Sequence, residues 1–148
     1  MQRHDLDTAV FNIDTHSFAN PGAGNDFLTA IDSRTRVQLI YFRATLQTDA
    51  NVANRRVVLS QDTGASGQFY SFSSINQTNG LTWTYSFAIG VPHLDATAIA
   101  NLVSVPLPDQ FFINPNDPLS LAIVNKQVGD TLSNISATYK QWTTYLAP

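Results

Sequence analysis

Apolar and polar side chains alternate along much of this 148-residue chain, and the alternation is most regular over residues 81–89. In this segment every second residue is large and apolar: Leu81, Trp83, Tyr85, Phe87 and Ile89. Threonine, serine or alanine fills the positions between them. Because successive side chains of a β-strand point to opposite faces of its sheet, this spacing predicts a central strand with one buried aromatic face.

Residues 35–62 contain a second strong pattern, in which two apolar segments, residues 37–46 and 57–59, flank a polar stretch at 48–54. This arrangement predicts a hairpin. One face of its first strand carries the core candidates Ile40, Phe42, Ala44 and Leu46. The other face is apolar as well and carries Val37, Leu39 and Tyr41. A strand that is apolar on both faces needs a second covering layer, so we expect these three residues to contact an N-terminal arm or another subunit.

Further short strands are predicted at residues 68–75, 111–113, 119–123 and 131–142. Asn79-Gly80 favours a tight turn, and hence a second hairpin between the strands at 68–75 and 81–89. The stretch 90–108 contains three prolines, which interrupt regular strands,. Within it, residues 95–102 suit a turn or two of helix, with Asp95 as the N-cap.

Seven or eight short strands at a spacing of roughly ten residues, with little helix, are typical of a sandwich or barrel. We therefore predict an all-β fold, an antiparallel β-sandwich with the topology of a jelly roll. An immunoglobulin-like sandwich is the second choice, since the Cys…Trp…Cys framework of that fold is absent,.

Residues 1–34 differ from the rest of the chain, because no apolar period is sustained there for the length of a regular element. We predict an extended N-terminal arm over residues 1–34, followed by a single sandwich domain over residues 35–148. The arm contains three aromatic residues that need a surface to lie on: Phe11, Phe18 and Phe27. That surface is either the sandwich itself or a neighbouring copy.

The composition narrows the classes of function. A formal net charge of −3, with only eight lysines and arginines, gives no basis for nucleic-acid binding,. The chain contains no cysteine, which excludes disulfides, thiolate catalysis and cysteine-type zinc sites,. No apolar run approaches the roughly 18 residues of a membrane span,. We expect neither nucleic acid nor membrane among the partners.

Candidate chemistry is sparse, and the sequence contains none of the familiar catalytic or phosphate-binding motifs,. One group of metal-ligand residue types lies near the N-terminus: His4, Asp5, Asp7, Asp14 and His16. We favour a solvated terminus, because nothing in the pattern fixes a ligand geometry. A second group, Asn114, Asn116 and Asp117, holds one carboxylate between prolines and favours a turn over a calcium site. We predict no enzyme activity, no cofactor and no metal.

Three aromatic residues suggest a different kind of site. Tyr41, Trp142 and Tyr145 would make a platform on which sugar rings stack, if they lay together on the surface. We favour burial of these side chains against the arm or another subunit, because Trp and Tyr are equally common in protein interfaces.

Three segments, taken together, resemble a group of small structural proteins of tailed bacteriophages. They are residues 43–59 (RATLQTDANVANRRVVL), 83–90 (WTYSFAIG) and 125–142 (NKQVGDTLSNISATYKQW), and the likeness spans residues 36–142. The resemblance implies a β-sandwich virion protein, such as a capsid decoration (cement), head-fibre or tail-associated protein, often a homotrimer. The implied partners are further copies of the chain and the major capsid protein or another virion protein. The implied location is the virion.

The resemblance also implies structural roles in the turn after the first strand. Asn51, Asn54 and Arg55 would be turn residues, with the Arg55 side chain holding the loop. The function expected on this basis is non-enzymatic binding to a capsid lattice. The alternative is a carbohydrate- or receptor-binding module of a fibre or tail.

Overall fold

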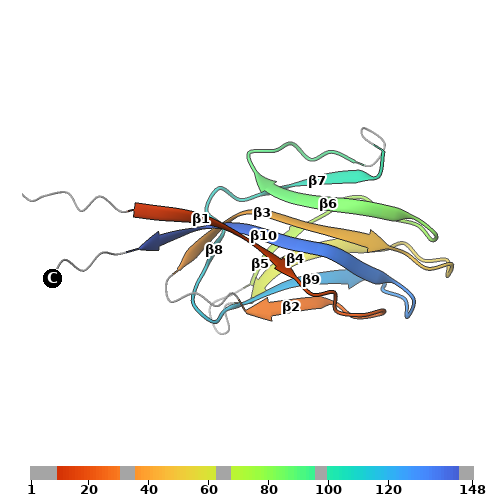
Figure 1. Cartoon of the computed structure of the whole chain (residues 1–148). Coiled ribbons are helices and arrows are strands. Elements are labelled where there is room, and N and C mark those ends of the chain that lie inside the picture. Colours follow the sequence, from red (N-terminus) through yellow and green to blue (C-terminus); the bar gives the residue numbers. More distant parts are fainter. Residues whose placement is uncertain (1–9, 31–35, 63–67, 96–99, 144–148) are drawn as a thin grey trace, which may run out of the picture.

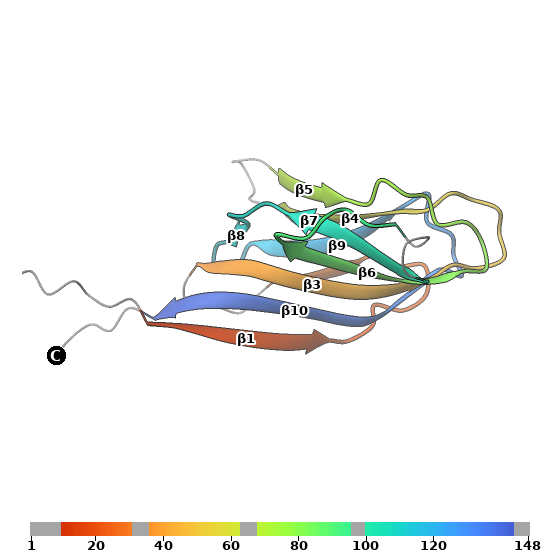
Figure 2. The ribbon, with the colours of Figure 1, turned by 90° about the horizontal axis from the view of Figure 1, so that it is seen from above.

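The computed structural model describes residues 10–30, 36–62, 68–95 and 100–143. This part of the chain forms ten strands and no helix, arranged as two sheets packed face to face (Figures 1 and 2). The predicted all-β sandwich is therefore confirmed. No helix that could span a membrane occurs among the described residues.

Two sheets share the strands unequally. Sheet A has the order β1 (Val10–Phe18), β10 (Thr131–Thr143), β3 (Val37–Gln47), β6 (Thr82–Ile89) and β7 (Leu102–Leu107), with β8 (Phe112–Ile113) paired to the start of β3. Sheet B has the order β2 (Phe27–Ala30), β9 (Pro118–Val124), β4 (Arg56–Asp62) and β5 (Gln68–Phe72).

Strand pairing is nested. If β7 and β8 are set aside, the first strand pairs with the last (β1 with β10), the second with the second last (β2 with β9), and so on through β3 with β6 to β4 with β5. All four pairs are antiparallel. As a result the chain crosses from one sheet to the other six times: between β1 and β2, β2 and β3, β3 and β4, β5 and β6, β8 and β9, and β9 and β10.

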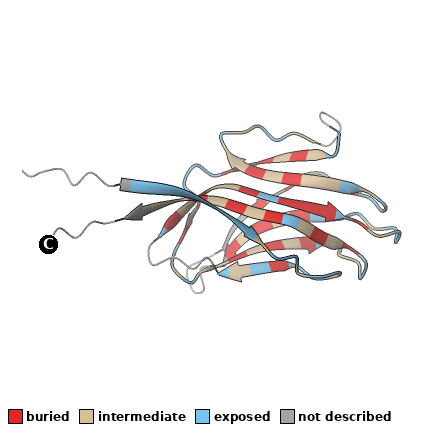
Figure 3. Ribbon diagram, in the orientation of Figure 1, coloured by how far each residue is buried: buried red, intermediate tan, exposed pale blue. Residues whose placement is uncertain are grey.

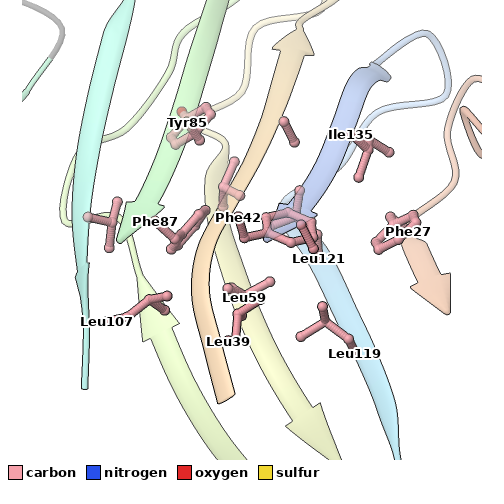
Figure 4. Close-up of a cluster of buried hydrophobic side chains, with 14 of the residues drawn as sticks. Phe27, Leu39, Phe42, Leu59, Tyr85, Phe87, Leu107, Leu119, Leu121 and Ile135 are labelled. Atoms are coloured by element: carbon pink, nitrogen blue, oxygen red, sulfur yellow. The ribbon is translucent and has the colours of Figure 1, made fainter. Parts of the chain in front are cut away.

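These crossings overturn the two predicted hairpins. β3 and β4 lie in different sheets, as do β5 and β6. The physical reason is burial: the apolar faces of β3 and β4 cover each other across the sandwich, which removes more apolar surface from water than a flat two-stranded hairpin can. Figure 4 shows Phe42 of β3 and Leu59 of β4 within the cluster of buried side chains.

One pair departs from the predicted antiparallel pattern. β6 and β7 run parallel, so residues 90–101 carry the chain back along the sheet before β7 begins. The sequence did not predict β7, because Pro106 lies within it. Proline is tolerated there because β7 is the last strand of sheet A, where one side of the strand needs no ladder partner,. The helix suggested at 95–102 includes residues 96–99, which lie outside the described part, and Leu102 begins β7.

A one-residue bulge in β3 explains the apparent excess of apolar residues at its start. Leu39 pairs with Tyr139 and Tyr41 pairs with Thr138, so Ile40 is an extra residue with no partner on β10. An extra residue reverses the alternation of faces. Val37 and Leu39 therefore enter the same core as Phe42, and all three are completely buried. The prediction that Val37 and Leu39 form an outer apolar face is wrong.

The prediction of no regular element within residues 1–34 is also wrong. β1 adds to sheet A beside β10, and β2 adds to sheet B beside β9. Phe27 of β2 is 4% exposed, and its ring lies 5.9 Å from that of Phe42 in the core. No alternation is visible in these residues because β1 is an exposed edge strand and β2 is an edge strand of only four residues,.

Candidate functional site

The start of β1 and the end of β10 extend together beyond the other strands of the sandwich (Figures 1 and 2). We name this end of sheet A the terminal ribbon and define it as residues 10–14 paired with residues 139–143. Residues 139–141 also pair with β3, so only residues 10–11 and 142–143 extend beyond that strand. Within it, Phe11 lies opposite Trp142 and Ile13 lies opposite Lys140. These paired positions share one face of the ribbon.

Two large apolar side chains of the terminal ribbon are open to solvent. Phe11 is 47% exposed and Ile13 is 58% exposed, and Figure 3 shows β1 as exposed along most of its length. The ammonium group of Lys140 lies 3.7 Å from the centre of the Phe11 ring, in a cation–π contact,. Neighbouring apolar side chains that project into water are characteristic of a surface that binds another protein.

The backbone along the outer edge of β1 is also available for pairing with another strand. β1 is an end strand of sheet A, and no described strand pairs with its outer side. The other end strands are shorter: β2 has four residues, β5 has five and β7 has six with a proline, whereas β1 has nine. Short length and proline are devices that prevent edge-to-edge pairing, and β1 has neither. Its outer edge can therefore accept a further strand.

The residues predicted to contact other subunits fall into two groups. Phe11 is exposed, and Phe18 is half-buried with its ring 5.2 Å from that of Phe27. Phe27, Val37 and Leu39 belong to the core and present no side chain to a partner. The prediction of a contact surface at these three residues is therefore wrong.

The predicted sugar platform is not assembled by the described residues. Tyr41 is half-buried, and its hydroxyl lies 3.3 Å from Oγ of Ser86. Tyr145 and the side chain of Trp142 lie outside the described part of the structure.

The connection between β3 and β4 contains the most elaborate polar cluster of the molecule, centred on Arg55. The guanidinium group is completely buried and uses all five of its N–H groups. Nε and Nη2 donate to the two carboxylate oxygens of Asp130 at 3.0 and 2.9 Å, and Nη2 also donates to Asp49. Nη1 donates to the backbone carbonyls of Asn51 and Ala53 at 2.8 and 2.9 Å.

Asp130 is the charged partner that compensates the burial of the Arg55 guanidinium group. Its carboxylate accepts four hydrogen bonds, two from Arg55 and one each from the backbone N–H groups of Asp49 and Gln127. Burial alone would raise the pKa of Asp130, but the hydrogen bond from Arg55, the two backbone donors and the positive charge of Arg55 outweigh it. The pKa of Asp130 is therefore lowered, and the pKa of Arg55 is raised by the same pair,.

Four of the six crossings between the sheets meet at this end of the sandwich: β1–β2, β3–β4, β5–β6 and β9–β10. The β5–β6 connection contacts the Arg55 cluster through Gln77, whose backbone exchanges two hydrogen bonds with the backbone of Arg55. The β1–β2 connection joins through the N–H of Gly24, which donates to the carbonyl of Asp130 at 2.7 Å. Gly129 fits only as glycine, because a Cβ there would lie 2.8 Å from the Cβ of Asp49. The cluster thus fixes the loops relative to one another.

The structure places the three predicted turn residues around this cluster in different ways. Arg55 is its centre, and Asn51 supplies a carbonyl and also donates from its side chain to Asp49. Asn54 contributes its carbonyl to the side chain of Asn125 at 3.1 Å. Asp130 was missed, because its sequence context suggested only a turn. A buried arginine beside a strand needs an acidic partner, and that requirement was the signal available in the sequence.

The two groups of residues considered as candidate metal ligands do not form a site in the described residues. His4, Asp5 and Asp7 lie outside them, and no group of three or more potential ligands occurs among the rest. Asp117 accepts from the side chain of Asn114 at 2.8 Å, and its N–H donates to the carbonyl of Asn114 at 3.1 Å. These contacts are those of a turn.

Comparison of the chain with protein-family models, with curated proteins and with solved structures found no match.

Proposed function

We propose that this protein is a non-enzymatic virion structural protein, a capsid decoration protein that self-associates and binds the capsid lattice through the terminal ribbon. The proposal rests on the outer edge of β1, which is long, contains no proline and has no pairing strand among the described residues. The exposed side chains of Phe11 and Ile13 lie beside this edge. The sequence resemblance to phage structural proteins supplies the expected partner, the major capsid protein, and the expected homotrimer.

The strand topology supports the same proposal. Nested pairing of eight strands, β1 with β10 inward to β4 with β5, is the pattern that a long hairpin makes when it is rolled into two sheets. We therefore assign the sandwich to the jelly-roll topology, with β7 and β8 as an insertion before β9. Jelly rolls are common in viral capsid proteins and in lectins.

Docking by the terminal ribbon has two components that act together. Backbone N–H and C=O groups along the outer edge of β1 would pair with a strand of the partner, which gives affinity with little dependence on sequence. Phe11 and Ile13 would add burial of apolar surface, of the order of 1.5–3 kcal/mol for each side chain that becomes fully covered. The fixed loops at the opposite end keep the sandwich rigid while the ribbon is engaged.

A sedimentation experiment tests the proposal. Heads assembled from the major capsid protein encoded in the same genome are mixed with the purified protein and pelleted. The wild-type protein should pellet with the heads, whereas the Phe11→Ser/Ile13→Ser double variant should remain in the supernatant. A genome that encodes no capsid protein, or heads that leave the wild-type protein in solution, would overturn the proposal.

The matched control is Val52→Ser/Val128→Ser. These two valines are 92% and 83% exposed and lie in the loops at the opposite end of the sandwich. The control removes two exposed apolar side chains without touching the terminal ribbon, so it should pellet like the wild-type protein. If the control is lost and the Phe11/Ile13 variant is retained, the loop end is the docking surface instead.

A further inference from the structure

The outer face of sheet A carries a row of small hydroxyl side chains with one positive charge at its centre. Register places Ser17, Ser136, Arg43, Ser86 and Ser104 side by side on the five successive strands of the sheet. The flanking residues on β3, Phe42 and Ala44, are completely buried, so Arg43 points to the solvent side,. Arg43 is exposed there.

Arg43 has no ionic partner within the described part of the protein. The strands of sheet A contain a single acidic residue, Asp14, which alternates with Thr15 and Ser17 and therefore lies on the opposite face of β1,. The hydrogen bonds between side chains on this face join other residues, such as Thr15 to Thr138 and Tyr41 to Ser86. A lone guanidinium group in a field of hydroxyls has an electrostatic preference for an anion.

A depression of about 340 Å³ lies beside Arg43 at the end of β1. Its polar lining consists of Arg43, two hydroxyls (Ser17 and Ser136) and two amides (Asn20 and Asn134). Phe18 and Ile135 also border it, although the Ile135 side chain is buried in the core and Phe18 packs against that core. The volume is near the lower end of the roughly 300–1,000 Å³ found for small-molecule sites. It suits one sugar-sized group rather than an extended ligand.

A bulge in β10 shapes this depression. β10 uses three steps, from Ser133 to Ser136, where β3 uses two, from Thr45 to Arg43. Asn134 occupies the extra position, with a positive φ of 51° that asparagine tolerates better than most residues,. The bulge turns the Asn134 side chain to the surface, where its amide nitrogen lies 3.5 Å from Oγ1 of Thr45.

We propose that this depression binds an acidic sugar residue, such as a uronic or sialic acid of a surface polysaccharide, with its carboxylate on Arg43. Guanidinium and carboxylate match as a bidentate pair, whereas a phosphate site would gather several cations or backbone N–H groups. The serine hydroxyls and asparagine amides can exchange hydrogen bonds with ring hydroxyls. The site lies on the same outer face of sheet A as Phe11 and Ile13 but at the other end of β1, and its test does not require capsid binding.

An NMR titration tests the site with D-glucuronate, D-galacturonate and N-acetylneuraminate as probes. D-glucose serves as the neutral control, at matched ionic strength. At least one of the acidic sugars should shift the backbone amides of Ser17, Asn134 and Ser136 in the wild-type protein, and glucose should not. Arg43→Gln should weaken binding of that sugar at least about tenfold, the effect expected for loss of a charge-assisted hydrogen-bonded pair.

Arg36→Gln is the matched control. Arg36 is also exposed and directly precedes β3, the strand that carries Arg43. Its guanidinium group lies 4.2 Å from the centre of the Phe112 ring. This variant makes the same change in net charge and should bind the acidic sugar like the wild-type protein. Failure of all three acidic sugars to shift the named amides, equal binding of glucose, or unchanged affinity in Arg43→Gln would overturn the proposal. The proposal would also be overturned if no acidic sugar bound the wild-type protein and Arg43→Gln, but not Arg36→Gln, lost capsid binding. That result would assign Arg43 to an acidic side chain of a protein partner.

Discussion

At the residue scale, the buried ion pair of Arg55 and Asp130 holds together several of the loops that connect the two sheets. Arg55 and Asp130 are both completely buried, and each satisfies the other together with nearby backbone groups. Such a pair adds little stability compared with apolar residues of the same size, but removing one member leaves a buried charge without a partner. Its main effect here is to specify which loops meet.

Arg55→Met should therefore be strongly destabilising. We expect a loss of about 3–5 kcal/mol in the free energy of unfolding, measured by urea denaturation, because Asp130 keeps its charge and loses its partner. Arg56→Met, at the exposed neighbouring position, should change it by less than about 1 kcal/mol,. The double variant Arg55→Met/Asp130→Leu should lose less than the sum of the two single variants. Additive losses would show that the two side chains do not act as a pair.

The lowered pKa of Asp130 makes a prediction about acid stability. A carboxyl whose pKa is lower in the folded state stabilises the fold at pH values above its unfolded pKa, ordinarily 3.8, and loses that contribution as the pH falls through the folded value,. Unfolding free energies measured from about pH 6 down to about pH 2 should fall steeply below about pH 4. Asp130→Asn should start lower and show a weaker acid dependence. An unchanged slope in Asp130→Asn would contradict the assigned pKa.

The bulge in β3 is the feature of greatest consequence at the scale of the element. Ile40 brings Val37 and Leu39 onto the core side together with Phe42. Deletion of Ile40 would turn Val37 and Leu39 outward or force the strand to slip, and each exposed side chain forfeits roughly 1.5–3 kcal/mol of burial. Circular dichroism with thermal melting should show loss of the cooperative transition, or a large fall in its midpoint, for the deletion. Ile40→Ala should retain the transition, and equal effects of the two changes would contradict the role of the bulge.

β6 is the element that the sequence predicted best, and it provides a direct test of the core. Phe87 is completely buried, and its ring meets that of Phe42 edge to face at 6.2 Å. Phe87→Ala should lower the unfolding free energy by about 3–5 kcal/mol. Thr82→Ala, at an exposed position of the same strand, should cost less than about 1 kcal/mol,. Similar costs at both positions, measured in urea, would contradict the assignment of the core.

The elements that the sequence predicted are those with a simple period. Central strands such as β6 bury the middle of one face, with Tyr85 and Phe87 completely buried, so their alternation is visible in the amino acids themselves. β1 and β7 were missed because an edge strand buries little or tolerates proline, as at Pro106,. The bulge at Ile40 was interpreted as an excess of apolar surface, because a fixed period of two cannot represent a one-residue shift.

At the scale of the whole molecule, the partition of strands between sheets depends on contacts that a local pattern does not contain. The stretch at 48–54 and Asn79-Gly80 do lie between strands, but each connection carries the chain across the sandwich, so the hairpins inferred from them are wrong. Only part of the candidate docking surface could likewise be predicted from the sequence. Phe11 was predicted as a contact residue, but its edge strand and the neighbouring Ile13 became apparent only with β1 in place.

The two surfaces proposed for binding lie on different parts of this architecture. The terminal ribbon lies at the start of β1, whereas the Arg43 depression lies near the end of β1 on the outer face of sheet A. Phe11 and Ile13 belong to the same outer face, so the two surfaces are separated along the strand and not by the sheet,. The opposite end, with its loops fixed around Arg55, serves stability.

Hydrogen–deuterium exchange of β1 with and without capsids tests the central claim most directly. In the unbound protein the outer edge of β1 has no ladder partner among the described strands, so part of its backbone N–H groups should exchange rapidly,. Addition of heads should slow exchange in residues 10–18 more than in any loop at the Arg55 end. Unchanged exchange in β1, with protection appearing at the loop end or nowhere, would contradict docking by the terminal ribbon.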